Sequence, residues 1–196
     1  MKISSLLLAS GLLAAGLSSQ TQLLRGKIED VKNTQNRFVL DCTNIPLTST
    51  VLNLNMLVGQ QYIMQVVNTG SASSPSLDVR SVTATTKVFD MGNIRLERAD
   101  RWQVRWKPNS TTAVGITATA ATSYMPLRSM GTFLLGSQLA LMARGRVNQL
   151  GVFEFSYQPP NITSLVGLSV TGQALVQEPN GFLLLSNPDC KQVRSN

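Results

Sequence analysis

The strongest constraint on the fold is a run of alternating apolar and polar residues between positions 153 and 186. Residues 153–157 alternate aromatic with polar side chains, in the order Phe153, Glu154, Phe155, Ser156, Tyr157. After a break at Pro159-Pro160-Asn161, residues 165–176 place apolar side chains on one face and polar ones, Ser169, Thr171 and Gln173, on the other. A period of two is the mark of half-buried β-strands.

A turn signal then leads into a third apolar segment. Asn180-Gly181 precedes residues 182–185, which read Phe-Leu-Leu-Leu. Asn-Gly is well suited to the positive φ angles of a tight hairpin turn. Residues 153–186 are therefore predicted to form a three-stranded antiparallel meander.

Comparable segments recur through the chain at intervals of roughly eight to twelve residues, which is typical of an all-β sandwich. We expect strands over residues 37–42, 50–54, 61–67, 77–85, 94–98, 101–107 and 111–123, with a bulge near Arg80. Residues 20–35 are ambiguous and fit either a short helix or a loose lead-in. The prediction is an all-β fold with a single antiparallel β-sandwich of roughly ten strands, jelly-roll or Ig-like.

The chain length favours one domain over two. With 196 residues, the chain can bury one full core, and we assign residues 19–196 to a single sandwich. A split near residues 123–129 into two small β-domains is the alternative, and each half would then bury only a thin core.

Residues 1–18 have the pattern of a signal peptide. Lys2 supplies the positive charge, residues 6–17 supply the apolar segment, and small residues around Ser18 offer a cleavage site. The alternatives are an uncleaved membrane anchor and a buried N-terminal helix. An apolar run of this length falls short of the ~20 residues that span a bilayer. We therefore expect a secreted or periplasmic protein whose mature chain has no transmembrane segment.

The chain has two cysteines, Cys42 and Cys190. An even pair in an exported protein predicts one disulfide, which would tie the first expected strand to the end of the last. Free thiols or a catalytic dithiol are the alternative, but the wide spacing lacks the Cys-x-x-Cys form of redox sites.

One strand carries the best candidate binding residues. Trp102 and Trp106 share a face and lie about 13 Å apart at the usual rise per residue. Arg101, Arg105 and Lys107 flank them. Aromatic side chains can stack on sugars and the cations can hold phosphate, sulfate or carboxylate groups. The competing interpretation places Trp102, Val104 and Trp106 in the core, with the basic face in water.

Catalysis finds little support in the residue types. The chain has no histidine, which excludes Ser-His-Asp and Cys-His arrangements within it. The ten acidic residues are scattered, although Glu97 with Asp100, or Asp41 with Asp189, are candidate pairs for a glycosidase-type hydrolase. No metal-ligand or cofactor motif is present, so no cofactor is expected. The formal charge of +7 suits an anionic partner, but the basic residues are scattered and nucleic acid is not the expected one.

The C-terminal strands resemble a known type of module. Residues 165–174, Leu-Val-Gly-Leu-Ser-Val-Thr-Gly-Gln-Ala, followed by Leu185-Ser186-Asn187, are similar to the closing strands of uncharacterised β-sandwich modules in secreted proteins of environmental bacteria. That resemblance implies a fold and export, and no activity.

Three functional hypotheses follow. The first is an exported non-catalytic protein with a structural or interaction role at the cell surface. The second is a module that binds carbohydrate or polyanion through the Trp102–Lys107 strand, with polysaccharide or another extracellular surface as partner. The third is a hydrolase.

Overall fold

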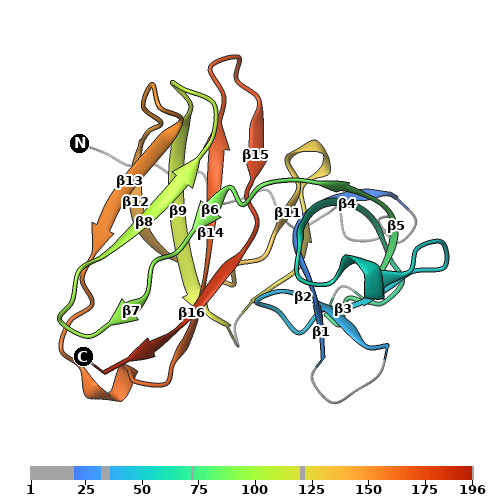
Figure 1. Ribbon diagram of the computed structural model, residues 1–196, viewed down its shortest axis with the longest axis horizontal. Helices are drawn as coiled ribbons and strands as arrows, with labels where there is room; N and C mark the ends of the chain where they lie inside the picture. The colour runs from blue at the N-terminus through green and yellow to red at the C-terminus, as the bar shows by residue number, and fades with distance from the viewer. Residues whose placement is uncertain (1–19, 32–35, 72, 120–121, 196) are drawn as a thin grey trace.

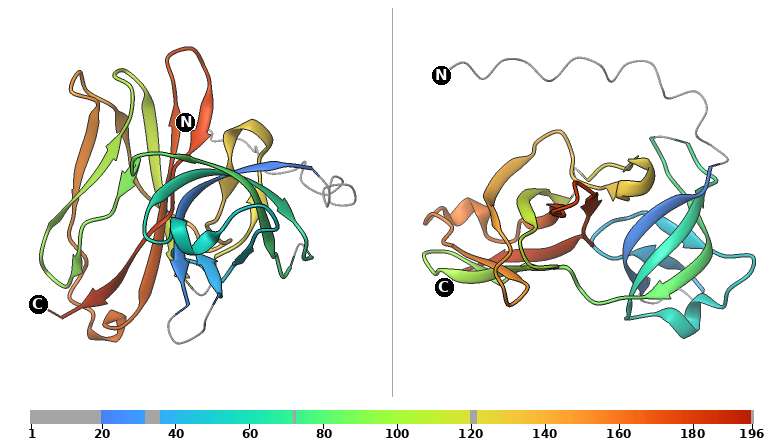
Figure 2. Two further views of the ribbon diagram at one scale, coloured as in Figure 1. Left: turned by 45° about the vertical axis from the view of Figure 1, so that its right-hand side comes forward. Right: turned by 90° about the horizontal axis from the view of Figure 1, so that it is seen from above.

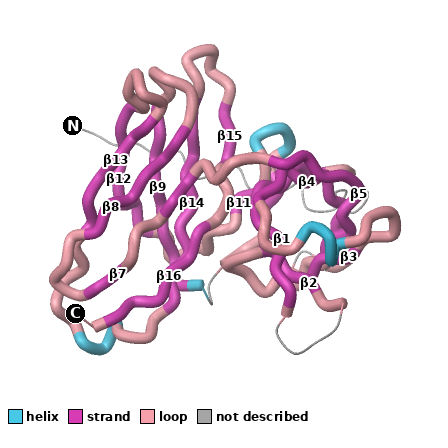
Figure 3. Tube along the Cα trace, in the orientation of Figure 1, coloured by secondary structure: helices cyan, strands magenta, loops and turns pink. Residues whose placement is uncertain are grey.

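The computed structural model of this chain describes residues 20–31, 36–71, 73–119 and 122–195, and the expected signal peptide lies outside them. The described residues are all-β, with sixteen strands, short 3₁₀ turns and no α-helix (Figure 3). The expected all-β class is confirmed, but the expected number of strands is too low, and a closed five-stranded barrel is present where a single sandwich was expected. Seven strands contain only two or three residues, which is too short for an alternating pattern to reveal them.

The N-terminal part is a closed barrel of five strands: β1 (Gln22–Asp30), β2 (Phe38–Leu40), β3 (Pro46–Thr48), β4 (Gln61–Asn68) and β5 (Leu77–Ala84). Their order is β1-β2-β3-β5-β4, antiparallel except between β3 and β5 (Figure 1). The 3₁₀ turn η1 (Leu54–Leu57) connects β3 to β4 and buries Leu54. A five-stranded barrel with this order is the architecture of the OB-fold.

Two local expectations in this part are wrong. Residues 22–30 form a nine-residue strand, neither a helix nor a loose lead-in. Gly26 lies at an inward position of β1, where a Cβ atom would collide with the side chain of Leu40, so the inward row lacks an apolar side chain there. The expected strand over residues 50–54 is a bend that leads into η1. The bulge near Arg80 is confirmed, because Gln65 pairs with Ser81 and Val66 pairs with Val79, which leaves Arg80 unmatched.

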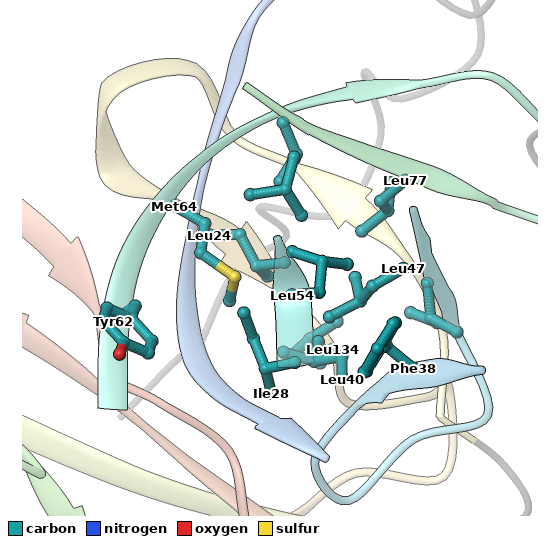
Figure 4. Packing of buried hydrophobic residues seen from close by; sticks show 13 residues of the cluster. Leu24, Ile28, Phe38, Leu40, Leu47, Leu54, Tyr62, Met64, Leu77 and Leu134 are labelled. Carbon is teal, nitrogen blue, oxygen red and sulfur yellow. The ribbon is translucent and has the colours of Figure 1, made fainter. Parts of the chain in front are cut away.

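The barrel has its own apolar core (Figure 4). Buried side chains of all five strands meet inside it, and these include Leu24, Leu40, Leu47, Met64 and Leu77. One further member, Leu134, comes from a distant segment of the chain. That segment contains β10 (Met125–Pro126), η3 (Arg128–Met130) and β11 (Thr132–Phe133). Within it, Thr132 donates a hydrogen bond from Oγ1 to the carbonyl of Leu23 on β1, at 2.9 Å.

The C-terminal part consists of two facing sheets (Figures 1 and 2). The larger has the order β12 (Ala140–Arg146), β9 (Thr111–Ala118), β14 (Ser169–Gln177), β16 (Asp189–Arg194) and β7 (Ile94–Arg95), and β15 (Leu183–Leu185) also pairs with β14. The smaller has the order β13 (Val152–Tyr157), β8 (Asp100–Arg105) and β6 (Phe89–Asp90). A second apolar cluster lies between them, with Phe89 and Trp102 from one side and Val114, Ala174 and Val176 from the other.

The predicted meander is confirmed only in its second half. β14 and β15 form the antiparallel hairpin, with Gly181 at a φ of 85° in the turn. Residues 153–157 instead pair with β8 in the other sheet, with Glu154 opposite Gln103. The aromatic face of β13 needs an apolar surface, and it packs against Trp102 of β8 inside the second cluster. Adjacency in sequence therefore did not decide the pairing.

The 3₁₀ turn η4 (Thr163–Leu165) connects β13 to β14. Val166 and Leu168, expected on the apolar face of the strand, lie ahead of β14 and are exposed. Across the described residues, no helix has both the length and the apolar character that crossing a membrane would require.

Candidate functional site

The structure separates the five predicted binding residues into three environments. Trp102 is fully buried, and its ring meets those of Phe89, Phe155 and Tyr157 at centroid distances of 6.2, 5.5 and 5.4 Å. It therefore belongs to the core between the sheets. The predicted platform of two exposed tryptophans does not form, because an inward position on β8 faces the second sheet.

Arg101 and Arg105 lie on the opposite, exposed face of β8. The Arg101 guanidinium contacts Glu154 of the neighbouring strand, with 3.1 Å between Nε and Oε1. Arg105 donates from Nη2 to the side-chain oxygen of Gln103 at 2.9 Å. Gln103 in turn donates to Glu154 at 2.8 Å. These polar side chains satisfy one another along the outer face of the small sheet.

Trp106 and Lys107 meet Glu178, which lies just beyond the end of β14. The indole N–H of Trp106 donates to Glu178 Oε1 at 3.0 Å, and Lys107 Nζ donates to Oε2 at 3.0 Å. The hydrogen bond from Lys107 is the main reason that the pKa of the Glu178 carboxyl lies below its usual value, and the bond from Trp106 adds to it. Glu178 is thus a fixed anion that anchors the end of β8 to the β14–β15 hairpin.

The face of Trp106 is also occupied. The guanidinium carbon of Arg25, on β1 of the barrel, lies 5.5 Å from the centre of the indole ring, within the range of a cation–π contact. Burial lowers the pKa of Arg25. Trp106 is half-buried and links the barrel to the sheets, so its ring is not an open stacking surface.

A polar pocket of about 340 Å³ opens beside Glu178. Its lining includes Asn109, Thr111, Arg146, Gln177 and Glu178. Arg146 donates from Nε to the carbonyl of Asn109 at 3.2 Å. Amide, hydroxyl and guanidinium groups on one rim are suited to hydrogen-bonding a polar ligand. Arg146 and Glu178 were not predicted as site residues, since they come from different strand ends and no short motif joins them.

The predicted disulfide is confirmed. Cys42, in the loop after β2, is bonded to Cys190 on β16, with 5.4 Å between their Cα atoms and a sequence separation of 148. The hydroxyl of Thr171 donates to the carbonyl of Cys42 at 3.4 Å. The barrel and the large sheet are therefore joined covalently.

The carboxylates of Asp41 and Asp189 do converge near this disulfide, as one of the hydrolase pairings supposed. Asp189 is buried and accepts from the backbone N–H of Met91 at 2.6 Å, while Lys87 Nζ lies 2.8 Å from it. Burial raises the pKa of Asp41, and Lys27, 3.5 Å away, opposes that rise. Asp189 is thus held by backbone and lysine partners as a structural group at the junction.

Asp41 also lies within 4.8 Å of both cysteine sulfurs. Because the two sulfurs are bonded to each other, neither is available as a thiolate ligand, and the three groups do not make a metal site. The other candidate pair, Glu97 and Asp100, lines neither the pocket beside Glu178 nor the smaller one on the face of the large sheet.

Comparison with known proteins places little beside this chain. No protein-family model and no curated protein matches it. Among solved structures, the chain is similar to the crystal structure of a tetra-tandem repeat in the extending region of a large adhesion protein, with 17% identity and a TM-score of 0.31. The match covers 92% of this chain and 43% of that one, so this chain spans less than half of its length.

Proposed function

We propose that the protein is an exported, non-catalytic β-protein with a structural or interaction role at or outside the cell surface. The observation that carries this proposal is the disulfide between Cys42 and Cys190, which joins the barrel to the large sheet. Disulfides persist in oxidising compartments and are rare in the reducing cytosol. The signal-peptide pattern of residues 1–18 supports the same location.

The arrangement of the titratable groups supports a structural role. Glu178, Asp189 and Glu154 each pair with a cationic side chain from a distant part of the chain. The two facing sheets around Trp102 support assigning this part to the secreted β-sandwich modules that the closing strands resemble. We propose further that barrel and sheets act as one body, since the disulfide and the contacts of residues 132–134 join them.

The test is the fate of the full chain in a bacterial host that has a periplasm. Mass spectrometry of the recovered protein is expected to show cleavage after Ser18 or Ser19 and no free thiol. A control lacking residues 2–18 should remain in the cytoplasm with both thiols reduced. Recovery of the uncleaved full chain in the cytoplasm, with two free thiols, would contradict the proposal.

A second candidate function is binding of a carbohydrate or polyanion. It is favoured by the polar pocket at Glu178, which adjoins the predicted residues Trp106 and Lys107. A glycan and polyanion array probed with the mature protein tests it. Selective binding to charged glycans that falls with Arg146→Gln is expected, and an array without signal would remove this candidate while leaving the first intact.

A further inference from the structure

The outer face of the large sheet is only half covered. Near the barrel, Thr171 and Gln173 of β14 point outward, yet both are buried because the barrel and residues 132–134 lie over them. Towards the other end of the same strand, Leu175 is 39% exposed and Gln177 is exposed. Two members of the polar row that the sequence placed on a solvent face, Thr171 and Gln173, are therefore buried, whereas the open part carries an apolar floor.

The open half is built from two rows of cross-strand neighbours. The strands β12, β9, β14 and β15 lie side by side there (Figure 1). The first row runs Arg144, Ala113 and Leu175 and ends on Leu185, which is buried; the second runs Arg146, Thr111, Gln177, Leu183. Each row thus begins with an arginine on the edge strand β12 and ends on a leucine of β15.

These rows form a continuous groove. A depression of about 160 Å³ lies over Ala113, Leu175 and Leu183 with Arg144 at its side. It shares Thr111 and Gln177 with the polar pocket that contains Arg146 and Glu178. One surface therefore offers an apolar floor, amide and hydroxyl groups, two guanidinium groups along one wall, and, in its polar part, the Glu178 carboxylate that Lys107 neutralises.

Neither arginine of this wall has an acidic partner. Arg144 and Arg146 are exposed, and in the part of the chain that the structure describes neither takes part in an ion pair. By contrast, Arg101 on the other sheet contacts Glu154. Because Arg144 and Arg146 are two residues apart on one strand, the distance between their Cα atoms is about 7 Å. Each guanidinium can hold a carboxylate or sulfate in a bidentate manner.

We propose that this groove binds an acidic polysaccharide, with Arg144 and Arg146 on its carboxylate or sulfate groups and the apolar face of a sugar ring over Leu175. The chain's net charge of +7 complements such a polymer. Single-stranded nucleic acid is less well suited, because its binding relies on aromatic side chains that stack on bases and the groove is lined by none. The proposal deepens, and rests on, the second candidate function.

The test measures binding of the mature, disulfide-bonded protein to polygalacturonate, to neutral dextran and to single- and double-stranded DNA oligonucleotides at physiological salt. The variant Arg144→Gln with Arg146→Gln is expected to weaken polygalacturonate binding by at least about tenfold. The matched control, Arg101→Gln with Arg105→Gln, removes the same charge from the other sheet and should change binding by less than about twofold. Leu175→Ala, which leaves the charge unchanged, should weaken binding about threefold.

Three outcomes would overturn the proposal. Equal losses in the two double variants would show diffuse electrostatic attraction in place of a groove. Equal or tighter binding to either DNA would assign the surface to nucleic acid. Absence of binding to polygalacturonate would overturn the proposal; if a glycan on the array bound with an affinity that Arg144→Gln with Arg146→Gln left unchanged, the second candidate function would survive without this groove. Thermal unfolding of each variant confirms that the substitutions leave the fold intact.

Discussion

Gln173 on β14 holds the backbone of Leu134, whose N–H donates to the Gln173 side-chain oxygen at 3.0 Å. The amide nitrogen of Gln173 donates in turn to the carbonyls of Thr132 and Ser186, at 2.9 and 3.0 Å. One buried side chain thus connects residues 132–134, whose Leu134 lies inside the barrel, to β14 and to Ser186 just after β15.

Gln173→Ala should therefore destabilise the protein strongly. It leaves three buried backbone groups without these partners, and each unsatisfied group costs about 1–3 kcal/mol, so we expect a loss of about 3 kcal/mol or more. Urea unfolding provides the measurement, and the exposed Gln177→Ala on the same strand is the control. A loss below about 1 kcal/mol would mean that water replaces these bonds.

Removing the disulfide should lower stability without changing the fold. The double variant Cys42→Ala with Cys190→Ala removes a crosslink between residues 148 positions apart. For such a crosslink the chain-entropy model gives a contribution to the free energy of unfolding of up to about 4–5 kcal/mol. We expect a loss of about 3–5 kcal/mol in urea unfolding. Reducing agent should destabilise the wild-type protein by a similar amount and leave the variant unaffected. If reduction changed nothing in the wild-type protein, the crosslink would be absent in solution.

The two tryptophans should differ in their access to solvent. In Trp106→Phe, the remaining Trp102 is enclosed by aromatic rings and its fluorescence should resist acrylamide. In Trp102→Phe, the half-buried Trp106 should be quenched several times more readily. Trp102→Ala should cost about 3–5 kcal/mol in unfolding free energy, as large core truncations do. Efficient quenching of Trp102 would contradict its position between the sheets.

Asp41→Asn should stabilise the protein at neutral pH. Burial raises the pKa of Asp41 above its ordinary value of about 3.9, so the folded state binds a proton more readily than the unfolded chain. Stability therefore falls as pH rises from the unfolded-state pKa through the folded-state pKa, and the penalty is complete above the folded-state pKa. The variant's gain in melting temperature should be largest at pH 7 and vanish near pH 3. A loss at pH 7 would show that the attraction to Lys27 outweighs burial.

Glu178 should give the opposite dependence on pH. Its folded-state pKa lies below the ordinary value of about 4.3, so its stabilising effect is complete above that value and is lost as pH falls through the lower, folded-state pKa. Glu178→Gln should melt at a lower temperature than the wild-type protein at pH 7, and the difference should shrink in acid. Exposed Glu97→Gln serves as the control. A difference that stays constant down to pH 3 would assign the effect to packing.

Alternating patterns located β4, β5, β8 and β9, because a half-buried strand must alternate wherever its two faces meet different surroundings. They also placed the bulge at Arg80. The pattern is silent about partners, so residues 153–157 were placed beside β14 although they pair with β8. In β1, the inward position 26 is a glycine, because a Cβ atom there would collide with the side chain of Leu40. The row of apolar side chains is interrupted at that position, so hydrophobicity alone cannot reveal this strand.

The residues of the candidate groove could not be grouped from the sequence either, because the sequence pattern does not show which strands pair. Arg144 and Arg146 lie on one strand, but their neighbours Thr111 and Leu175 become neighbours only through the register of β12, β9 and β14. The candidate site at Trp102–Lys107 was predicted from neighbouring residues of one strand. Alternation along that strand puts Trp102 in the core and Arg101 and Arg105 on the opposite, exposed face. Whether a polar row such as Thr171 and Gln173 faces water depends on which distant segment covers it.

The position of Leu134 inside the barrel also bears on the order in which the molecule can assemble. The five barrel strands end at Ala84, so they leave the ribosome well before residue 134. Until then the barrel interior lacks one of its buried side chains, and Cys42 lacks its partner at position 190. Such long-range dependence slows folding, since distant segments must meet before their contacts form. The N-terminal strands therefore reach their final packing only after most of the chain has been delivered.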